Sequence, residues 1–102
     1  MSVSANDKIH VGIVGVGSIA QNAIMPAFLK QPDMEIIAVC DINKARAEEV
    51  AQKHGIKHVF TDFKEMVHLP ELDAVSVCTW NNAHAPATIA ALEAGKHVLC
   101  EK

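Results

Sequence analysis

The feature that most constrains this chain is a set of small residues between an apolar segment and a helical one. Gly15, Gly17 and Ala20 follow the apolar segment 8–14, and they open the segment 18–29, which has helical spacing. Gly15 permits a tight turn, Gly17 leaves its backbone open to close approach, and Ala20 keeps helix and strand together. Amide groups at the start of a helix attract anions. The spacing therefore predicts a phosphate-binding turn between a strand and a helix.

Five short apolar segments predict the strands of a parallel sheet. They are rich in Val and Ile and nearly continuous, which is typical of strands buried on both faces. The one around 58–60 has the weakest pattern. They lie at residues 8–14, 35–40, 58–60, 74–79 and 96–100.

Segments with helical spacing and recognisable ends separate these strands. Asn43 is a suitable N-cap for a helix that stops at Gly55. Asp62 and Glu65 have the spacing of a capping box, which predicts a short helix after the third strand. A further helix is predicted over residues 83–94.

The alternation of strands and helices predicts a doubly wound α/β sheet of the Rossmann type. Its crossovers should be right-handed and its strands ordered 3-2-1-4-5. Pro26 removes a backbone donor from the helical segment 18–29, so we expect that helix to break or kink. We expect residues 1–6 to be a loose tail and residues 7–102 to be a single truncated domain, with a second, substrate-binding domain absent.

An acidic residue at the end of the second strand makes the glycine turn specific for a dinucleotide. Asp41 follows 24 positions after Gly17, close to the offset of about 20 residues for the carboxylate that binds an adenosine ribose. A carboxylate there repels the extra phosphate of NADP, which favours NAD. Lys44 and Arg46 could reach such a phosphate if the loop folded back, but a solvated first helical turn is the favoured interpretation. The predicted cofactor-binding residues of this part are Gly15, Val16, Gly17, Ser18, Ile19 and Asp41.

Composition excludes several other partners. The net charge is −3 and the basic residues are scattered, which argues against nucleic acid. No segment approaches the roughly 20 apolar residues of a membrane span, and the start lacks the pattern of a secretory signal. Cys40, Cys78 and Cys100 lie far apart among apolar residues, as in cytoplasmic proteins with free thiols. The six histidines show no ligand spacing, so we expect no metal site.

Several segments together resemble one family. They are the glycine loop, Cys40-Asp41, the run Ala-Gly-Lys-His-Val at residues 94–98, and the closing Glu101-Lys102, which matches the start of a Glu-Lys-Pro signature. The chain thus resembles the glucose-fructose oxidoreductase and inositol dehydrogenase family (Gfo/Idh/MocA) over nearly its whole length. In that family the segment after the fourth strand reads Thr-Pro-Asn-x-x-His and lines the cofactor. Thr79, Asn81 and His84 match it, whereas Trp80 stands where proline is usual.

The resemblance implies roles that the residues alone do not. It places Lys102 at the active site as the catalytic lysine, and it adds Glu101, Thr79, Asn81 and His84 to the cofactor-binding residues. From the residues alone, Asn81 and His84 are equally suited to capping a helix. The implied parent enzyme transfers a hydride between NAD and a small sugar or polyol substrate. We expect it to be a cytoplasmic homo-oligomer, and we expect the 102-residue chain alone to be inactive.

Two other functions fit part of the pattern. A non-catalytic module could sense NAD with the same glycine loop and acidic strand end. An S-adenosylmethionine-dependent methyltransferase also joins a glycine loop to an acidic residue after its second strand. Such enzymes usually carry an acidic residue in the first strand, where Val11, Ile13 and Val14 stand here.

Overall fold

The computed structural model describes residues 8–17, 20–78 and 84–100, and its centre is a five-stranded parallel sheet. The sheet order is β3-β2-β1-β4-β5, so the predicted fold class and strand order are confirmed. The predicted tail at residues 1–6 lies outside the described residues. The strands are β1 (Ile9–Val14), β2 (Met34–Cys40), β3 (His58–Phe60), β4 (Ala74–Val77) and β5 (His97–Cys100).

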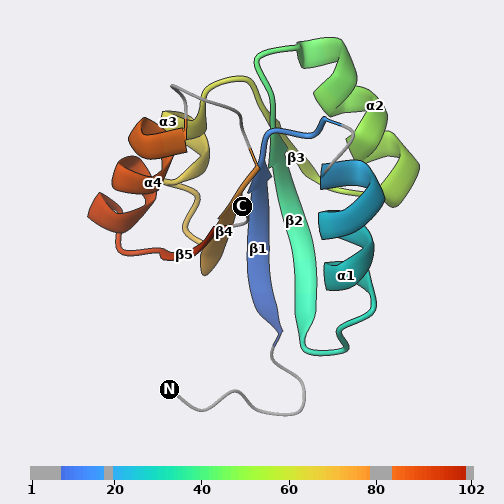
Figure 1. Ribbon diagram of the computed structural model, residues 1–102, viewed down its shortest axis with the longest axis horizontal. Coiled ribbons are helices and arrows are strands. Elements are labelled where there is room, and N and C mark those ends of the chain that lie inside the picture. Colours follow the sequence, from blue (N-terminus) through green and yellow to red (C-terminus); the bar gives the residue numbers. More distant parts are fainter. Residues whose placement is uncertain (1–7, 18–19, 79–83, 101–102) are drawn as a thin grey trace.

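Helices cover both faces of this sheet. Figure 1 shows α1 and α2 on one side and α3 and α4 on the other. Each side has its own buried cluster, one containing Ile13 and Val39 and the other containing Val75 and Met66. The three inner strands β1, β2 and β4 therefore have most of their residues buried, as their continuous apolar sequences predict, whereas β3 and β5 are only partly buried. The helical elements are η1 (Ala20–Ile24), α1 (Met25–Leu29), α2 (Lys44–His54), α3 (Phe63–Met66) and α4 (His84–Glu93).

The helix ends follow local signals in the sequence. The side chain of Asn43 accepts a hydrogen bond from the Arg46 amide at 3.1 Å, so Asn43 is the N-cap of α2. Gly55 ends that helix with a φ of 68°, a left-handed conformation that favours glycine. Asp62 is the N-cap of α3, as predicted. Its side chain accepts a hydrogen bond from the Lys64 amide at 2.9 Å. These caps fix where each helix leaves the sheet.

The first helical segment changes type along its length. Residues Ala20–Ile24 form a π-helical turn, and Pro26 lies in the first turn of the α-helix that follows. Because proline has no amide hydrogen, it cannot donate to the carbonyl group one turn earlier. The predicted break therefore takes the form of a wider turn directly before α1.

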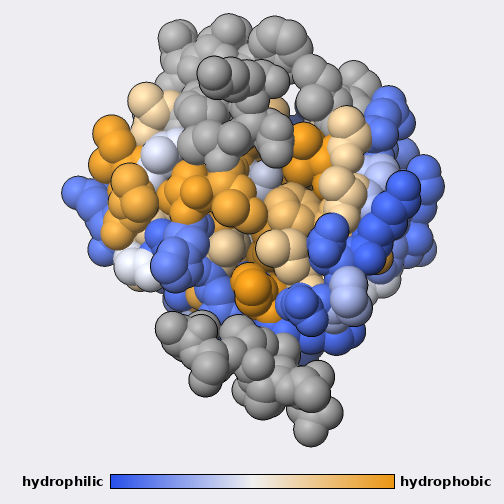
Figure 2. All heavy atoms as spheres, turned by 60° about the horizontal axis from the view of Figure 1, so that its bottom comes forward, coloured by the Kyte–Doolittle hydropathy of each residue, from blue (hydrophilic) through white to orange (hydrophobic). Residues whose placement is uncertain are grey.

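Part of the surface is apolar. Figure 2 shows hydrophobic residues gathered across the middle of one face, with hydrophilic residues on both sides. The side chains of Leu29, Ile89 and Leu92 are all more than half exposed, and β5 forms one edge of the sheet. Apolar surface and an open strand edge are typical of contacts with other chains. The expected homo-oligomer stays a prediction. Within the described ranges, no helix is long and apolar enough to cross a bilayer.

Candidate functional site

The glycine loop lies at the carboxyl ends of the parallel strands, the edge of the sheet at which the strands end. Gly15 has a φ of 87°, which favours glycine, and its amide donates to the Cys40 carbonyl at 2.7 Å. The next residue, Val16, is fully buried in the core on the α1 and α2 side of the sheet. A Cβ atom added at Gly17 would meet no atom of the described residues within 4 Å. The loop is thus anchored by Val16 while the backbone at Gly17 faces open space.

Asp41 connects this loop to the end of β2. Its side chain is only 6% exposed, and its two oxygens accept hydrogen bonds from different parts of the chain. Oδ2 accepts from the Val16 amide at 3.0 Å, and Oδ1 accepts from the Asn43 amide at 2.8 Å. The structure therefore brings together the glycine loop and the acidic residue, which are 25 positions apart in the sequence.

Three residues near this site were not among the predicted cofactor-binding residues. The Gln21 side chain donates to the Val16 carbonyl at 2.7 Å and ties the loop to η1. Arg46 is exposed in the first turn of α2, in agreement with the favoured interpretation, and its guanidinium also lies 3.3 Å from Asp41 Oδ1. Ile42 directly follows Asp41 and is 93% exposed. The signal for Ile42 in the sequence was its position directly after Asp41 at the end of the second strand. The contacts of Gln21 and Arg46 depend on the tertiary structure.

The remaining predicted site residues are not placed by the structure. Ser18, Ile19, Thr79, Asn81, Glu101 and Lys102 lie outside the described residues. His84 begins α4, but its side chain is not among those described. Their predicted roles in binding the cofactor, and that of Lys102 in catalysis, stay predictions.

A buried thiol lies directly beneath the site. Cys40 is the last residue of β2 and is 3% exposed. Burial, followed by the negative charges of Asp41, Asp62 and Glu65, raises the pKa of Cys40 from 9.0 to about 12. The thiol therefore stays protonated at neutral pH.

We expect iodoacetamide at pH 8 to modify Cys40 at least 100-fold more slowly in the folded chain than in the chain unfolded in urea. At this pH a thiol with a pKa of about 12 has roughly a thousandfold less thiolate than an ordinary one, and burial slows access further. Mass spectrometry of the peptide containing Cys40 measures both rates. Equal rates in the two states would show that the thiol is accessible and ionisable in the fold.

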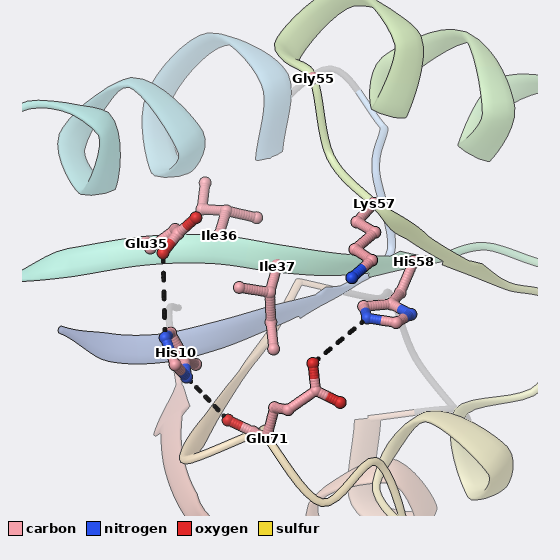
Figure 3. Close-up of a pocket in the computed structure, with 8 residues that line it drawn as sticks. All are labelled: His10, Glu35, Ile36, Ile37, Gly55, Lys57, His58 and Glu71. Carbon is pink, nitrogen blue, oxygen red and sulfur yellow. Dashed lines mark hydrogen bonds and ion pairs between the residues drawn. The ribbon is translucent and has the colours of Figure 1, made fainter. Parts of the chain in front are cut away.

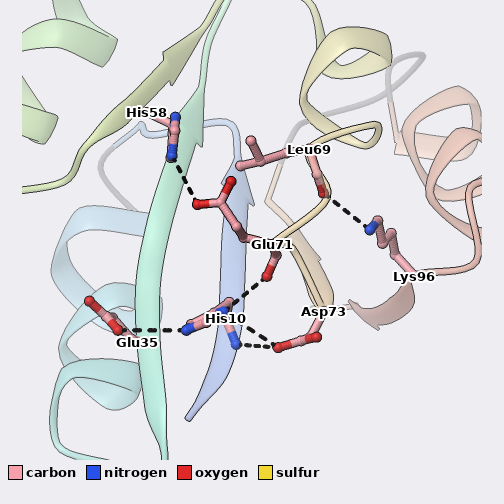
Figure 4. Close-up of polar contacts among 7 residues, drawn as sticks. All are labelled: His10, Glu35, His58, Leu69, Glu71, Asp73 and Lys96. Atoms are coloured by element: carbon pink, nitrogen blue, oxygen red, sulfur yellow. Dashed lines mark hydrogen bonds and ion pairs between the residues drawn. The ribbon is translucent and has the colours of Figure 1, made fainter. Parts of the chain in front are cut away.

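A pocket lies at the opposite edge of the sheet, where the strands begin, and charged side chains line it (Figure 3). His10 Nδ1 lies 2.9 Å from the Glu71 carbonyl oxygen, and its Nε2 lies 3.8 Å from Glu35 Oε1. His58 Nε2 lies 3.6 Å from Glu71 Oε2. Figure 4 shows that these contacts continue to Asp73, whose carboxylate accepts a hydrogen bond from the His10 amide at 2.8 Å.

These groups contact one another and join the beginnings of β1, β2 and β4. Ligands of open parallel sheets bind at the carboxyl ends of the strands, which is the other edge. Among the described residues, no group of three or more His, Cys, Asp or Glu side chains could hold a metal ion. The pocket is therefore best explained as part of the structural framework.

The edge with the glycine loop has the properties that a dinucleotide requires. Open space at Gly17 allows a pyrophosphate to approach the backbone, and η1 begins shortly after it. Among the described residues, Val16 alone donates a hydrogen bond to Asp41 Oδ2, which leaves a lone pair for a ribose hydroxyl group. The fold and this edge together define a dinucleotide-binding Rossmann domain.

Comparison with known proteins agrees with this class. Residues 9–102 match the family described as "Oxidoreductase family, NAD-binding Rossmann fold" (Gfo/Idh/MocA). D-glucoside 3-dehydrogenase of Escherichia coli (strain K12) is 37% identical to the chain, with 99% of the chain and 29% of that enzyme covered. The chain belongs to the Gfo/Idh/MocA family and forms its NAD-binding domain.

Two solved structures show the same fold. Scyllo-inositol dehydrogenase from Lactobacillus casei, with bound NAD(H) and scyllo-inositol, is 30% identical with a TM-score of 0.86, and the match covers 94% of the chain and 28% of that protein. A 3-ketoreductase from Actinomadura kijaniata in complex with TDP-benzene and NADP is 32% identical with a TM-score of 0.86, and the match covers 94% of the chain and 30% of that protein. The chain thus spans less than a third of the length of these relatives.

Proposed function

We propose that this chain binds NAD in preference to NADP, as the cofactor half of an enzyme that transfers a hydride to or from a sugar or polyol. The observation that carries the proposal is the position of Asp41, which is buried at the end of β2 and bonded to the glycine loop. A carboxylate held there accepts the ribose hydroxyl groups of NAD and repels the 2′-phosphate of NADP. The substrate class is proposed because the relatives include inositol and glucoside dehydrogenases.

Each part of the cofactor has a proposed partner in the chain. The backbone of Gly15, Val16 and Gly17, together with Ser18 and Ile19, would hold the pyrophosphate. Asp41 would hold the ribose, and the exposed Ile42 side chain would cover one face of the adenine. Thr79, Asn81, His84 and Glu101 would lie towards the nicotinamide.

The bound nicotinamide would supply the hydride acceptor or donor, while the protein positions it and manages the proton. We propose Lys102 as the active-site lysine. The rest of the parent protein would supply the substrate site and the remaining acid or base, so the 102-residue chain would bind the cofactor without turnover. We also propose that the parent is cytoplasmic, where a thiol such as that of Cys40 persists.

Isothermal titration of the chain with NAD and with NADP tests this proposal. We expect the dissociation constant for NAD to be at least about tenfold lower, because a phosphate next to a carboxylate costs on the order of 1 kcal/mol or more. NAD with a panel of polyols should give no NADH with the chain, but should give NADH with the full-length parent. Equal affinities for the two dinucleotides would contradict the cofactor preference, and a parent that binds NAD without turnover would favour the sensor alternative.

A further inference from the structure

Gln21, the second residue of η1, is joined twice to the glycine loop that precedes it. Its backbone amide donates to the Gly17 carbonyl at 3.0 Å, and its side-chain Nε2 donates to the Val16 carbonyl at 2.7 Å. Because a carbonyl oxygen only accepts hydrogen bonds, the NH₂ group of the Gln21 side chain must be the part that faces Val16. One residue of η1 therefore holds two consecutive carbonyl groups of the loop.

The helical segment that carries Gln21 is itself fixed to the core. Ala20, directly before Gln21, is 1% exposed, and Met25 at the start of α1 is fully buried. Both belong to the cluster that contains Ile13 and Val39. The hydrogen bond from Gln21 to Val16 is partly buried, and such a bond is stronger than one in open solvent. Gln21 is thus a firm point to which the loop is attached.

The bond to Val16 determines which way the next peptide unit of the loop faces. In a planar trans peptide unit the C=O and N–H groups point in opposite directions, so a Val16 carbonyl turned towards Gln21 directs the Gly17 amide away from it. The contact of the Val16 amide with Asp41 fixes only the preceding peptide unit. Gly17 has no side chain to restrict its φ angle. Without Gln21, the unit between Val16 and Gly17 would therefore be able to turn over.

The direction of this peptide unit matters for an anion bound at the loop. Backbone N–H groups attract phosphate oxygens, whereas the partial negative charge of a carbonyl oxygen repels them. Turning the unit over would replace a donor by an acceptor on the face of the loop that carries the Gly17 amide. The Gln21 side chain prevents this exchange, because it holds the acceptor on its own side.

We infer that Gln21 is a positioning residue for the pyrophosphate of the cofactor, which acts by holding the peptide unit between Val16 and Gly17 in one orientation. The inference rests on the proposed function, because it assumes that the pyrophosphate binds at the glycine loop. Gln21 needs no contact with the cofactor for this role.

The test compares Gln21→Met with Asn22→Leu as a matched control. Each variant replaces a side-chain amide by an apolar group of similar size, and Asn22 is the exposed residue that follows Gln21 in η1. Gln21→Glu is a second variant, since an ionised carboxylate keeps the shape of the side chain but has no donor. Calorimetric titration with NAD and ADP, and NMR titration with adenosine, separate the contribution of the phosphates. Thermal unfolding identifies the folded variants, and either folded Gln21 variant suffices.

We expect Gln21→Met to weaken binding of NAD and ADP about tenfold, on the scale of one hydrogen bond. Gln21→Glu should weaken them at least as much, because its charge also repels the phosphates. Adenosine has no phosphate, so its affinity should stay within about twofold of that for the unmodified chain, as should all three affinities in Asn22→Leu.

A second measurement needs no ligand. Relaxation dispersion of the Gly17 ¹⁵N amide should show exchange on the microsecond to millisecond timescale in Gln21→Met or Gln21→Glu. The unmodified chain and Asn22→Leu should show a flat profile, because Gln21 still holds the peptide unit.

An equal loss of affinity for NAD, ADP and adenosine would assign Gln21 a general structural role and overturn the inference. Unchanged affinity for NAD and ADP in a folded Gln21 variant, or a flat profile at Gly17 in that variant, would also overturn it while leaving the proposed function intact. If the unmodified chain binds neither NAD nor ADP, the proposed function fails, and this inference fails with it.

Discussion

Replacing Asp41 with alanine is expected to weaken NAD binding by about 1 to 3 kcal/mol and to lower the unfolding free energy by about 2 kcal/mol. Both effects arise from the same carboxylate. The loss in binding comes from the proposed contact between this carboxylate and the ribose. The loss in stability comes from the amides of Val16 and Asn43, which lose the acceptor that they share in this structure.

Asp41→Asn is the matched variant, because it keeps an oxygen acceptor and removes the charge. We expect Asp41→Asn to retain part of the stability, because its one oxygen can accept from only one of the Val16 and Asn43 amides, and to lose most of the discrimination against NADP. Urea unfolding and calorimetric titration of both variants separate the two effects. If Asp41→Ala bound NAD within twofold of the unmodified chain, the ribose would have to bind elsewhere.

Replacing Gly12 with valine is expected to lower the unfolding free energy by about 3 kcal/mol, near the upper end of the usual cost of overpacking a core. Gly12 lies in the middle of β1, and a Cβ atom there would lie 3.0 Å from Leu72 Cδ1 and 3.0 Å from Met66 Cε. Both neighbouring side chains are buried, and the two methyl groups of valine are restricted to few rotamers. Leu72 or Met66 must therefore shift, which disturbs the packing of these side chains against β1.

Gly17→Ala provides the control for Gly12→Val. In the part of the chain that the structure describes, a Cβ atom at Gly17 meets nothing within 4 Å, so urea unfolding should show a change of less than about 0.5 kcal/mol. Its effect should fall on NAD binding instead, because the added methyl group occupies the side from which the pyrophosphate approaches. An unfolding free energy of Gly12→Val within about 1 kcal/mol of the unmodified chain would contradict the packing argument.

Most of the fold could be predicted because its signals are local. Continuous apolar segments predict buried parallel strands, and the crossover rule then leaves few possible strand orders. Asn43 and Gly55 bound α2 through contacts within the helix itself, and such contacts depend on only a few neighbouring residues. The observed order β3-β2-β1-β4-β5 agrees with these signals.

Features that depend on distant residues could not be predicted. The register shift between Val11 and Gly12 arises from the pairing of β1 with β2. Pro26 predicted a disturbance of the first helical segment, but not that it would take the form of a π-helical turn. Likewise, the sequence pointed to Asp41 as a ligand but not to its bond with Val16 or its contact with Arg46. Side-chain direction across a loop decides those contacts.

The central claim is that NAD binds at the edge of the sheet formed by the glycine loop and Asp41. Titration of the ¹⁵N-labelled chain with NAD, followed by amide chemical shifts, tests both the binding and its position. We predict that the largest shifts occur at Gly15, Val16, Gly17 and Asn43, while the amides of His10 and His58 at the opposite edge stay unchanged. Saturating NAD without shifts at the glycine loop, or with the largest shifts around His10 and His58, would contradict the account.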